Sequence, residues 1–61
     1  MKIQYTGLNY AEVRNFCGDK VLAPYFCMGF SMLSLQTPDG YVTVNEGDWI
    51  EQCADGEFRV I

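Results

Sequence analysis

Three turn signals divide the C-terminal half of the chain into short segments, and their spacing is the feature that most restricts the fold. The signals are Thr37-Pro38-Asp39-Gly40, Asn45-Glu46-Gly47 and Ala54-Asp55-Gly56. Pro and Gly occupy the positions that a type I turn favours in the first, and the third contains the Asp-Gly pair typical of hairpins. Residues 41–44, 48–53 and 57–61 are therefore predicted to be short antiparallel strands.

The first residues predict a strand followed by a capped helix. Residues 2–5 alternate in polarity, which is typical of a strand. Asn9 is a good N-cap residue, and Glu12 stands three positions later, where a capping box places its acid. Leu8 and Val13 have the spacing of a hydrophobic staple.

The helix itself is predicted over residues 10–17. Its apolar residues recur at helical spacing on one face, and they are Tyr10, Val13, Phe16 and Cys17. Gly18 follows as a natural helix stop.

Residues 21–36 leave two interpretations open. Val21 and Leu22 begin a second strand, which Pro24 interrupts. As one strand, residues 25–36 would carry Tyr25, Cys27, Gly29, Ser31, Leu33 and Leu35 on one face and Phe26, Met28, Phe30 and Met32 on the other. Both faces are largely apolar, which indicates either a strand covered on both sides or a surface that meets a partner. The competing interpretation is a helix opened by Pro24, although the glycine and two serines weaken it.

These elements predict one α+β domain over residues 1–61 with the order β-α-β-β-β-β. We expect a small twisted antiparallel meander, either open or partly rolled towards a barrel, with the short N-terminal helix covering one face. A chain of 61 residues buries only about 60% of its unfolded surface, so its stability margin is thin. There is little room in one copy for a deep catalytic pocket.

The charge is negative and unevenly distributed. The net charge is -4, and the four basic residues are scattered, which argues against direct nucleic-acid binding. Residues 1–38 carry three basic and two acidic side chains, whereas residues 39–61 carry six acids against Arg59 alone. The C-terminal part therefore presents an acidic surface, which either solvates the protein or docks on a basic partner.

Cysteine usage favours a reducing compartment. Cys17, Cys27 and Cys53 are odd in number, form no CxxC pair and have no His to complete a zinc site. The N-terminus lacks the apolar segment of a secretory signal, so we expect a cytosolic protein with reduced thiols. Residues 21–35 are too short and too interrupted to predict a membrane span. No metal or cofactor is expected.

Catalytic chemistry is not indicated. The chain has no His to act as a general base, and Ser31 and Ser34 lack the context of a catalytic serine. Glu46 and Asp48 flank Gly47, where acids are typical of turns rather than of a cation site. We therefore predict that the protein is not an enzyme.

Short motifs spread along the chain resemble a group of small phage and prophage proteins, mostly of unknown function. The matching stretches are Tyr5-Thr6-Gly7, Asn9, Glu12-Val13, Phe16, Gly18, Leu35, Thr37, Gly40, Val42, Val44, Gly47-Asp48-Trp49-Ile50 and Gly56-Glu57-Phe58. Residues 25–32 depart from this group because they are far more apolar. The resemblance implies a fold and a phage origin, not a site.

The leading hypothesis is a non-enzymatic phage accessory protein that binds and inhibits a host defence protein, such as a CRISPR effector, in the cytoplasm of the infected bacterium. Its target would have a basic, nucleic-acid-binding surface. The candidate partner-binding residues are Asp48, Glu51, Asp55, Glu57, Phe26, Met28, Phe30, Met32 and Trp49. The single Trp49 is expected to anchor the core against Val13 and Phe16, with an exposed binding hot spot as the alternative.

Three alternatives remain. The apolar residues 25–35 could instead form a homodimer interface. An oligomer could sequester a nucleotide immune signal through Tyr10, Arg14, Lys20, Tyr41 and Arg59, although the acidic balance opposes a phosphate ligand. A minor structural role in the phage particle is the third.

Overall fold

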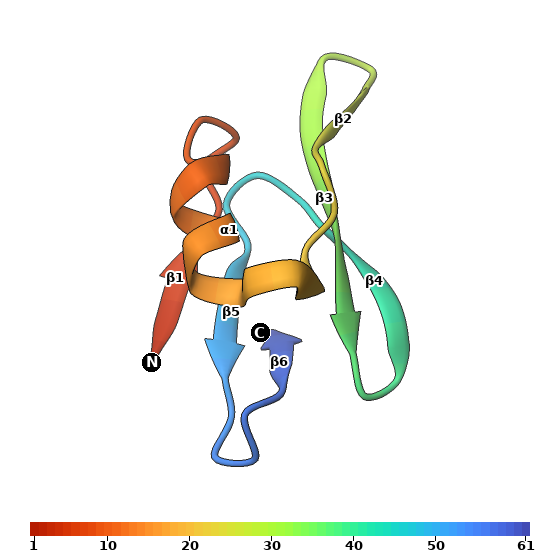
Figure 1. Cartoon of the computed structure of the whole chain (residues 1–61). Coiled ribbons are helices and arrows are strands. Elements are labelled where there is room, and N and C mark those ends of the chain that lie inside the picture. The colour runs from red at the N-terminus through yellow and green to blue at the C-terminus, as the bar shows by residue number, and fades with distance from the viewer.

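Six short strands and one α-helix make up the computed structural model, which describes residues 1–61. In chain order the elements are β1 (Lys2–Gln4), α1 (Tyr10–Cys17), the 3-10 helix η1 (Gly18–Lys20), β2 (Tyr25–Cys27), β3 (Phe30–Thr37), β4 (Gly40–Val44), β5 (Trp49–Gln52) and β6 (Phe58–Val60). The strands form two three-stranded antiparallel sheets, β1-β5-β6 and β2-β3-β4 (Figure 1). The predicted α+β class is confirmed, and no barrel closes.

The sheet β1-β5-β6 brings the two ends of the chain together. Its register pairs Ile3 with Ile50 and Ile50 with Val60, so these three side chains share one face. Ile50 on that face is fully buried. The turn after β4 carries the chain across to this sheet, which is why the predicted strands divide between two sheets rather than form one continuous meander.

The sheet β2-β3-β4 is built from two hairpins with two-residue loops. Its register pairs Cys27 with Phe30 and Thr37 with Gly40, so the loops are Met28-Gly29 and Pro38-Asp39. The second loop confirms the predicted turn.

The first loop corrects the interpretation of residues 25–36 as one strand. Met28 has φ 52° and Gly29 has φ 85°. Two successive residues in the left-handed region are typical of a type I′ turn, whose twist matches that of a two-residue hairpin. The chain therefore reverses in the middle of the apolar run, and neither a single strand nor a helix forms there.

Helix α1 has the predicted bounds, but its first turn lacks the predicted side-chain cap. Val13 and Cys17 are buried in the core, and Tyr10 and Phe16 pack against it. Asn9 makes no capping bond to the helix. Its Oδ1 instead accepts hydrogen bonds from the backbone N–H and the hydroxyl of Thr6, which turns the preceding loop back on itself.

The predicted staple is also wrong, because Leu8 is 96% exposed and cannot pack on Val13. The loop conformation that Asn9 stabilises points Leu8 into solvent.

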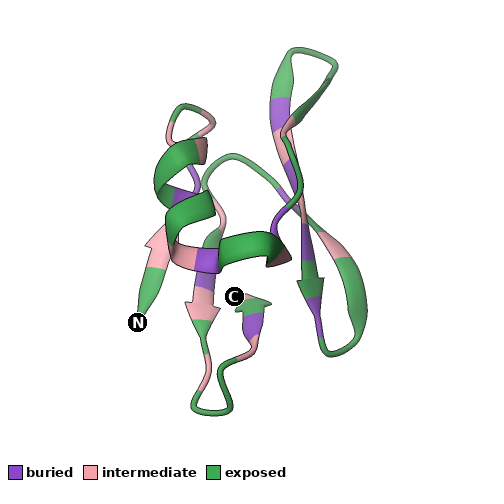
Figure 2. Ribbon diagram, viewed as in Figure 1, coloured by how far each residue is buried: buried purple, intermediate pink, exposed green.

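One hydrophobic cluster fills the space between α1 and the two sheets (Figure 2). Its buried members are Tyr5, Val13, Cys17, Val21, Leu33, Leu35, Val44, Ile50 and Phe58. The rings of Phe16 and Phe58 meet edge to face, with their centroids 5.6 Å apart.

Trp49 does not belong to this cluster, which corrects its predicted role as the core anchor. Side chains alternate between the two faces of a strand, so the burial of Ile50 turns Trp49 to the opposite face. It is 40% exposed there.

Candidate protein-binding surfaces

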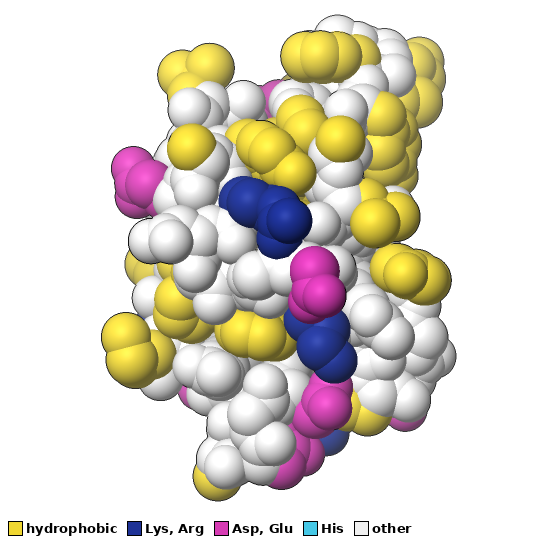
Figure 3. Space-filling model, viewed as in Figure 1, with side chains coloured by type: hydrophobic (Ala, Val, Ile, Leu, Met, Phe, Trp, Pro, Cys, Tyr) yellow, Lys and Arg dark blue, Asp and Glu magenta, His cyan; other side chains and the backbone are white.

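The tip of the β2–β3 hairpin exposes several large apolar side chains. Phe26 is 79% exposed and Met28 is 93% exposed, whereas Met32 further along β3 is half-buried. Tyr25 and Phe30 are also exposed. Figure 3 shows hydrophobic side chains gathered over this part of the molecule. These side chains cover both faces of the hairpin tip, and large exposed apolar surface of this kind marks an interaction site.

This hairpin carries no charge. Residues 21–38 contain no Asp, Glu, Lys or Arg, although the chain as a whole has a net charge of -4. The charged residues belong to the rest of the molecule, where basic and acidic side chains alternate along a band on the face shown in Figure 3. The apolar tip therefore has no charge with which to select a charged partner.

Strand β2 is also an open edge. The strand order β2-β3-β4 leaves one side of β2 without a neighbour. A two-residue hairpin closes on a hydrogen-bonded pair, which here is Cys27 and Phe30. Further along the strands, hydrogen-bonded and non-hydrogen-bonded pairs alternate. Phe26 opposite Ser31 is therefore a non-hydrogen-bonded pair, so the backbone N–H and C=O of Phe26 point outward.

The base of the hairpin is fixed by polar contacts to Tyr5 and Glu46, which lie just outside strands β1 and β5 of the other sheet. Glu46 Oε2 accepts a hydrogen bond of 2.7 Å from the backbone N–H of Ser31, at the point where β4 no longer accompanies β3. The Ser31 hydroxyl is 2.6 Å from the hydroxyl of the buried Tyr5. Gly7 allows the approach of Glu46, because a Cβ on Gly7 would lie 2.7 Å from Glu46 Cδ. These contacts fix the position of the β2–β3 hairpin at Ser31, and the apolar tip extends from that fixed point.

The face of sheet β1-β5-β6 that points away from the core forms a second candidate surface, which we call the Trp49 face. Its register places Lys2, Glu51 and Arg59 side by side across the three strands. Trp49 lies on the same face, with Lys2 Nζ 5.5 Å from its ring centroid. A half-exposed Trp beside a row of alternating charges has the composition of a polar protein interface.

The remaining predicted acids surround this sheet, but each is engaged locally. Asp48 Oδ2 accepts from the backbone N–H of Asn45, and Asp55 Oδ1 accepts from that of Glu57, so both stabilise turns. Glu57 forms an ion pair of 3.7 Å with Lys20. The acids and the apolar hairpin lie on different sheets, and the β5–β6 and β2–β3 loops point in opposite directions (Figure 1). They do not form one continuous surface.

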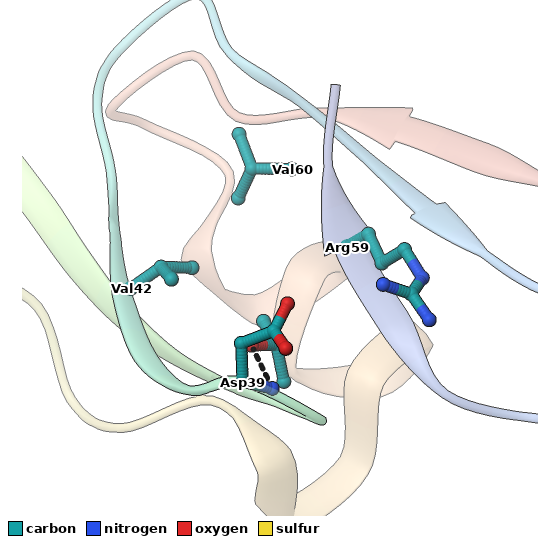
Figure 4. A pocket seen from close by; sticks show the side chains of 5 residues that line it. Asp39, Val42, Arg59 and Val60 are labelled. Carbon is teal, nitrogen blue, oxygen red and sulfur yellow. Dashed lines mark hydrogen bonds between the residues drawn. The ribbon is translucent and has the colours of Figure 1, made fainter.

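A shallow hollow of about 210 Å³ lies between the β3–β4 loop and β6 (Figure 4). Thr37, Asp39, Val42, Arg59 and Val60 line it. The thiol of Cys53, and then the carboxylates of Asp55 and Asp39, raise the pKa of Arg59 above its ordinary value. Asp39 lines the same hollow as Arg59, so its carboxylate opposes the binding of an anion there.

The residues predicted for nucleotide binding are dispersed in one copy. Tyr10 and Arg14 lie on α1, Lys20 is paired with Glu57, and Tyr41 is exposed on β4. Of the predicted set, Arg59 alone lines the hollow. Sequestration of a nucleotide by an oligomer remains a prediction.

The three cysteines are free and occupy different environments. Cys17 is buried, Cys53 is half-buried and Cys27 is exposed at the hairpin tip. Burial raises the pKa of the Cys17 thiol to about 11. No group of three or more Cys, Asp or Glu side chains converges in a way that would hold a metal ion.

The single α-helix has neither the length nor the apolar character needed to cross a bilayer. Comparison with protein-family models, with curated proteins and with solved structures finds no match to this chain. The resemblance to small phage proteins therefore stays a prediction, and the hairpin tip and the Trp49 face are the structural features that point to binding.

Proposed function

We propose that this chain is a non-catalytic protein inhibitor that occupies the surface of a host defence protein in the cytoplasm of a phage-infected bacterium. The observation that carries the binding part is the Trp49 face, where a half-exposed Trp lies beside a row of alternating charges on the face of the sheet that points away from the core. The phage and host parts rest on the sequence resemblance alone.

Trp49 supplies the apolar centre of the proposed contact. Trp is among the residues most enriched at binding hot spots, because one side chain brings a large apolar area and little conformational entropy to lose. The Lys2 ammonium lies 5.5 Å from its ring centroid, within range of a cation–π contact that favours one orientation of the indole before binding. A partner that covers the ring would gain affinity from this preorganisation.

The acids supply selectivity for a basic partner. Glu51 lies within the Trp49 face, and Asp48 and Asp55 lie in the turns that flank its central strand. Complementary charge raises the rate of association and excludes partners of like charge. A nucleic-acid-binding channel provides such a basic surface, and an acidic protein seated in it would block the natural ligand.

The test is an interference assay against candidate defence systems, in which phage survival is scored with each variant. We expect Trp49→Ala and Glu51→Lys to reduce inhibition by at least about 10-fold, the loss produced by one disrupted hot-spot contact. Glu12→Lys is the matched control, because Glu12 is an exposed acid on α1 with no role in the proposed contact. Full inhibition by both face variants would contradict the proposal, as would equal loss in the control.

A further inference from the structure

We propose that the apolar hairpin tip is covered by a second copy of this chain, and that the two copies join through antiparallel pairing of their β2 strands. The two-fold axis would pass beside Phe26, and the paired sheets would form one six-stranded sheet. This inference uses a different surface from the Trp49 face, so it does not depend on the proposed function.

The first support is the direction of the backbone groups on β2. The backbone N–H and C=O groups of Tyr25 and Cys27 point at β3, whereas those of Phe26 point at the open edge. If a second β2 strand pairs antiparallel with Phe26 at the centre, the N–H of each Phe26 donates to the C=O of the other. Both outward-facing backbone groups are then hydrogen-bonded. Pro24 has no N–H to offer and limits the pairing to this short stretch.

The second support is the area available. Tyr25, Phe26, Met28 and Phe30 are between 42% and 93% exposed. With about 200 Å² for each fully exposed side chain, they present roughly 550 Å² in one copy. Two copies offer roughly 1,100 Å² of such surface, and full coverage of it would bury slightly less than the lower limit of about 1,200 Å² for specific protein interfaces. The neighbouring backbone and the exposed Leu22 add to this area.

The third support is the absence of charge. Two chains of net charge -4 repel each other, and residues 21–38 form a surface through which they can meet without bringing like charges together. Homodimer interfaces are more apolar than transient interfaces between different proteins. An uncharged apolar tip therefore fits a second copy better than it fits a charged partner.

The proposed register also predicts complementary packing. Centring on Phe26 places Tyr25 of one copy opposite Cys27 of the other, on the same face as Phe30 and Met32. The small Cys27 side chain leaves room for the Tyr25 ring of the second copy to approach Phe30. On the other face the two Phe26 rings meet each other.

Oligomeric state is the first test, measured by light scattering after size exclusion from micromolar to millimolar protein. We expect the wild type to have twice the mass of the 6.9 kDa chain. Phe26→Lys should raise the dimer dissociation constant at least about 100-fold, because it places like charges at the two-fold axis. Leu8→Lys is the matched control, since Leu8 is an even more exposed apolar residue outside the hairpin, and it should remain dimeric.

Disulfide crosslinking tests the register, with Cys53→Ser in every variant. In the proposed pairing Cys27 lies about 8 Å from its own symmetry mate, too far for a disulfide, because the two are offset by two residues along the strands. Tyr25→Cys should crosslink across the interface under mild oxidation, because a non-hydrogen-bonded antiparallel pair lies within disulfide range. Tyr41→Cys, exposed on β4, should give no more crosslinking than the parent.

A wild type that stays monomeric at every concentration overturns the proposal and leaves the tip for a different protein. A dimer that survives Phe26→Lys, or that crosslinks through Tyr41→Cys as readily as through Tyr25→Cys, overturns the assignment to β2. Circular dichroism and thermal unfolding of each variant show that the changes act on association rather than on folding.

Discussion

At the scale of single residues, Cys17 shows how burial sets chemistry in this small core. Its side chain is almost completely buried, and the loss of solvation raises the thiol pKa from 9.0 to about 11. The folded state therefore favours the neutral thiol. Because the thiolate is the reactive species, Cys17 is chemically quiet, whereas the more accessible Cys27 and Cys53 can react.

This shift predicts a dependence of stability on pH. The folded-state pKa lies above the unfolded value, so the contribution of Cys17 is complete below about pH 9 and is lost as the pH rises towards 11. Over those two units we expect Cys17 to account for a loss of up to about 2–3 kcal/mol in the free energy of unfolding. Urea unfolding at pH 8, 9, 10 and 11 measures the free energy of unfolding across this range.

Cys17→Ala is the reference for that series, because it removes the thiol and leaves the other titrating groups. The wild type should lose more stability than this variant between pH 9 and 11. Parallel slopes for the two proteins would show that burial does not control this thiol.

At the scale of elements, the β2–β3 hairpin is held by a turn whose sequence is poorly suited to it. Met28 adopts φ 52°, a conformation that non-glycine residues seldom take, and its side chain is almost fully exposed. Asn or Gly is the usual choice at this position of a type I′ turn. The backbone conformation of Met28 costs free energy, and its side chain gains no packing within its own chain. This supports a role for Met28 in contacts with the second copy at the tip.

Two substitutions in this turn should therefore have opposite effects on stability. Met28→Asn should raise the free energy of unfolding of the monomer by about 0.5–1 kcal/mol, because Asn tolerates the left-handed conformation better. Gly29→Ala should lower it by about 1 kcal/mol through backbone strain alone, since an added Cβ meets no atom within 4 Å. Denaturant unfolding at low protein concentration measures both, and a destabilised Met28→Asn would contradict the turn assignment.

At the scale of the whole molecule, Glu46 ties the two sheets together. It belongs to the crossing between β4 and β5, packs against the backbone of Gly7 after β1, and accepts from the N–H of Ser31 on β3. Its carboxylate thus replaces the strand partner that β3 loses where β4 turns away. The hydrogen bond between Ser31 and Tyr5 lies beside it and joins the same two sheets.

Glu46→Ala should lower the free energy of unfolding by about 1–3 kcal/mol, because it leaves the part-buried Ser31 N–H without its acceptor. Glu46→Gln keeps an acceptor oxygen and should cost less. Amide hydrogen exchange gives the local readout, with faster exchange at Ser31 in the alanine variant. Unchanged protection of that amide would show that Glu46 does not hold the base of the hairpin.

The sequence alone determined the local elements. Residues 10–17, the strand at 2–5 and the three C-terminal strands were predictable because helical spacing, alternation and Gly or Pro turns act over a few neighbouring residues. The turn at Met28-Gly29 escaped prediction because only Gly29 signalled it, within a run that alternation and apolar character made resemble a strand.

The tertiary structure decided the rest. No local pattern tells β5 to pair with β1 rather than β4, since that choice depends on which arrangement buries Ile50 and Val44 in one cluster. The same choice turned Trp49 outward, because one buried strand residue fixes the direction of its neighbour. It also separates the acids from the apolar hairpin, although the sequence alone predicts that both belong to one set of partner-binding residues.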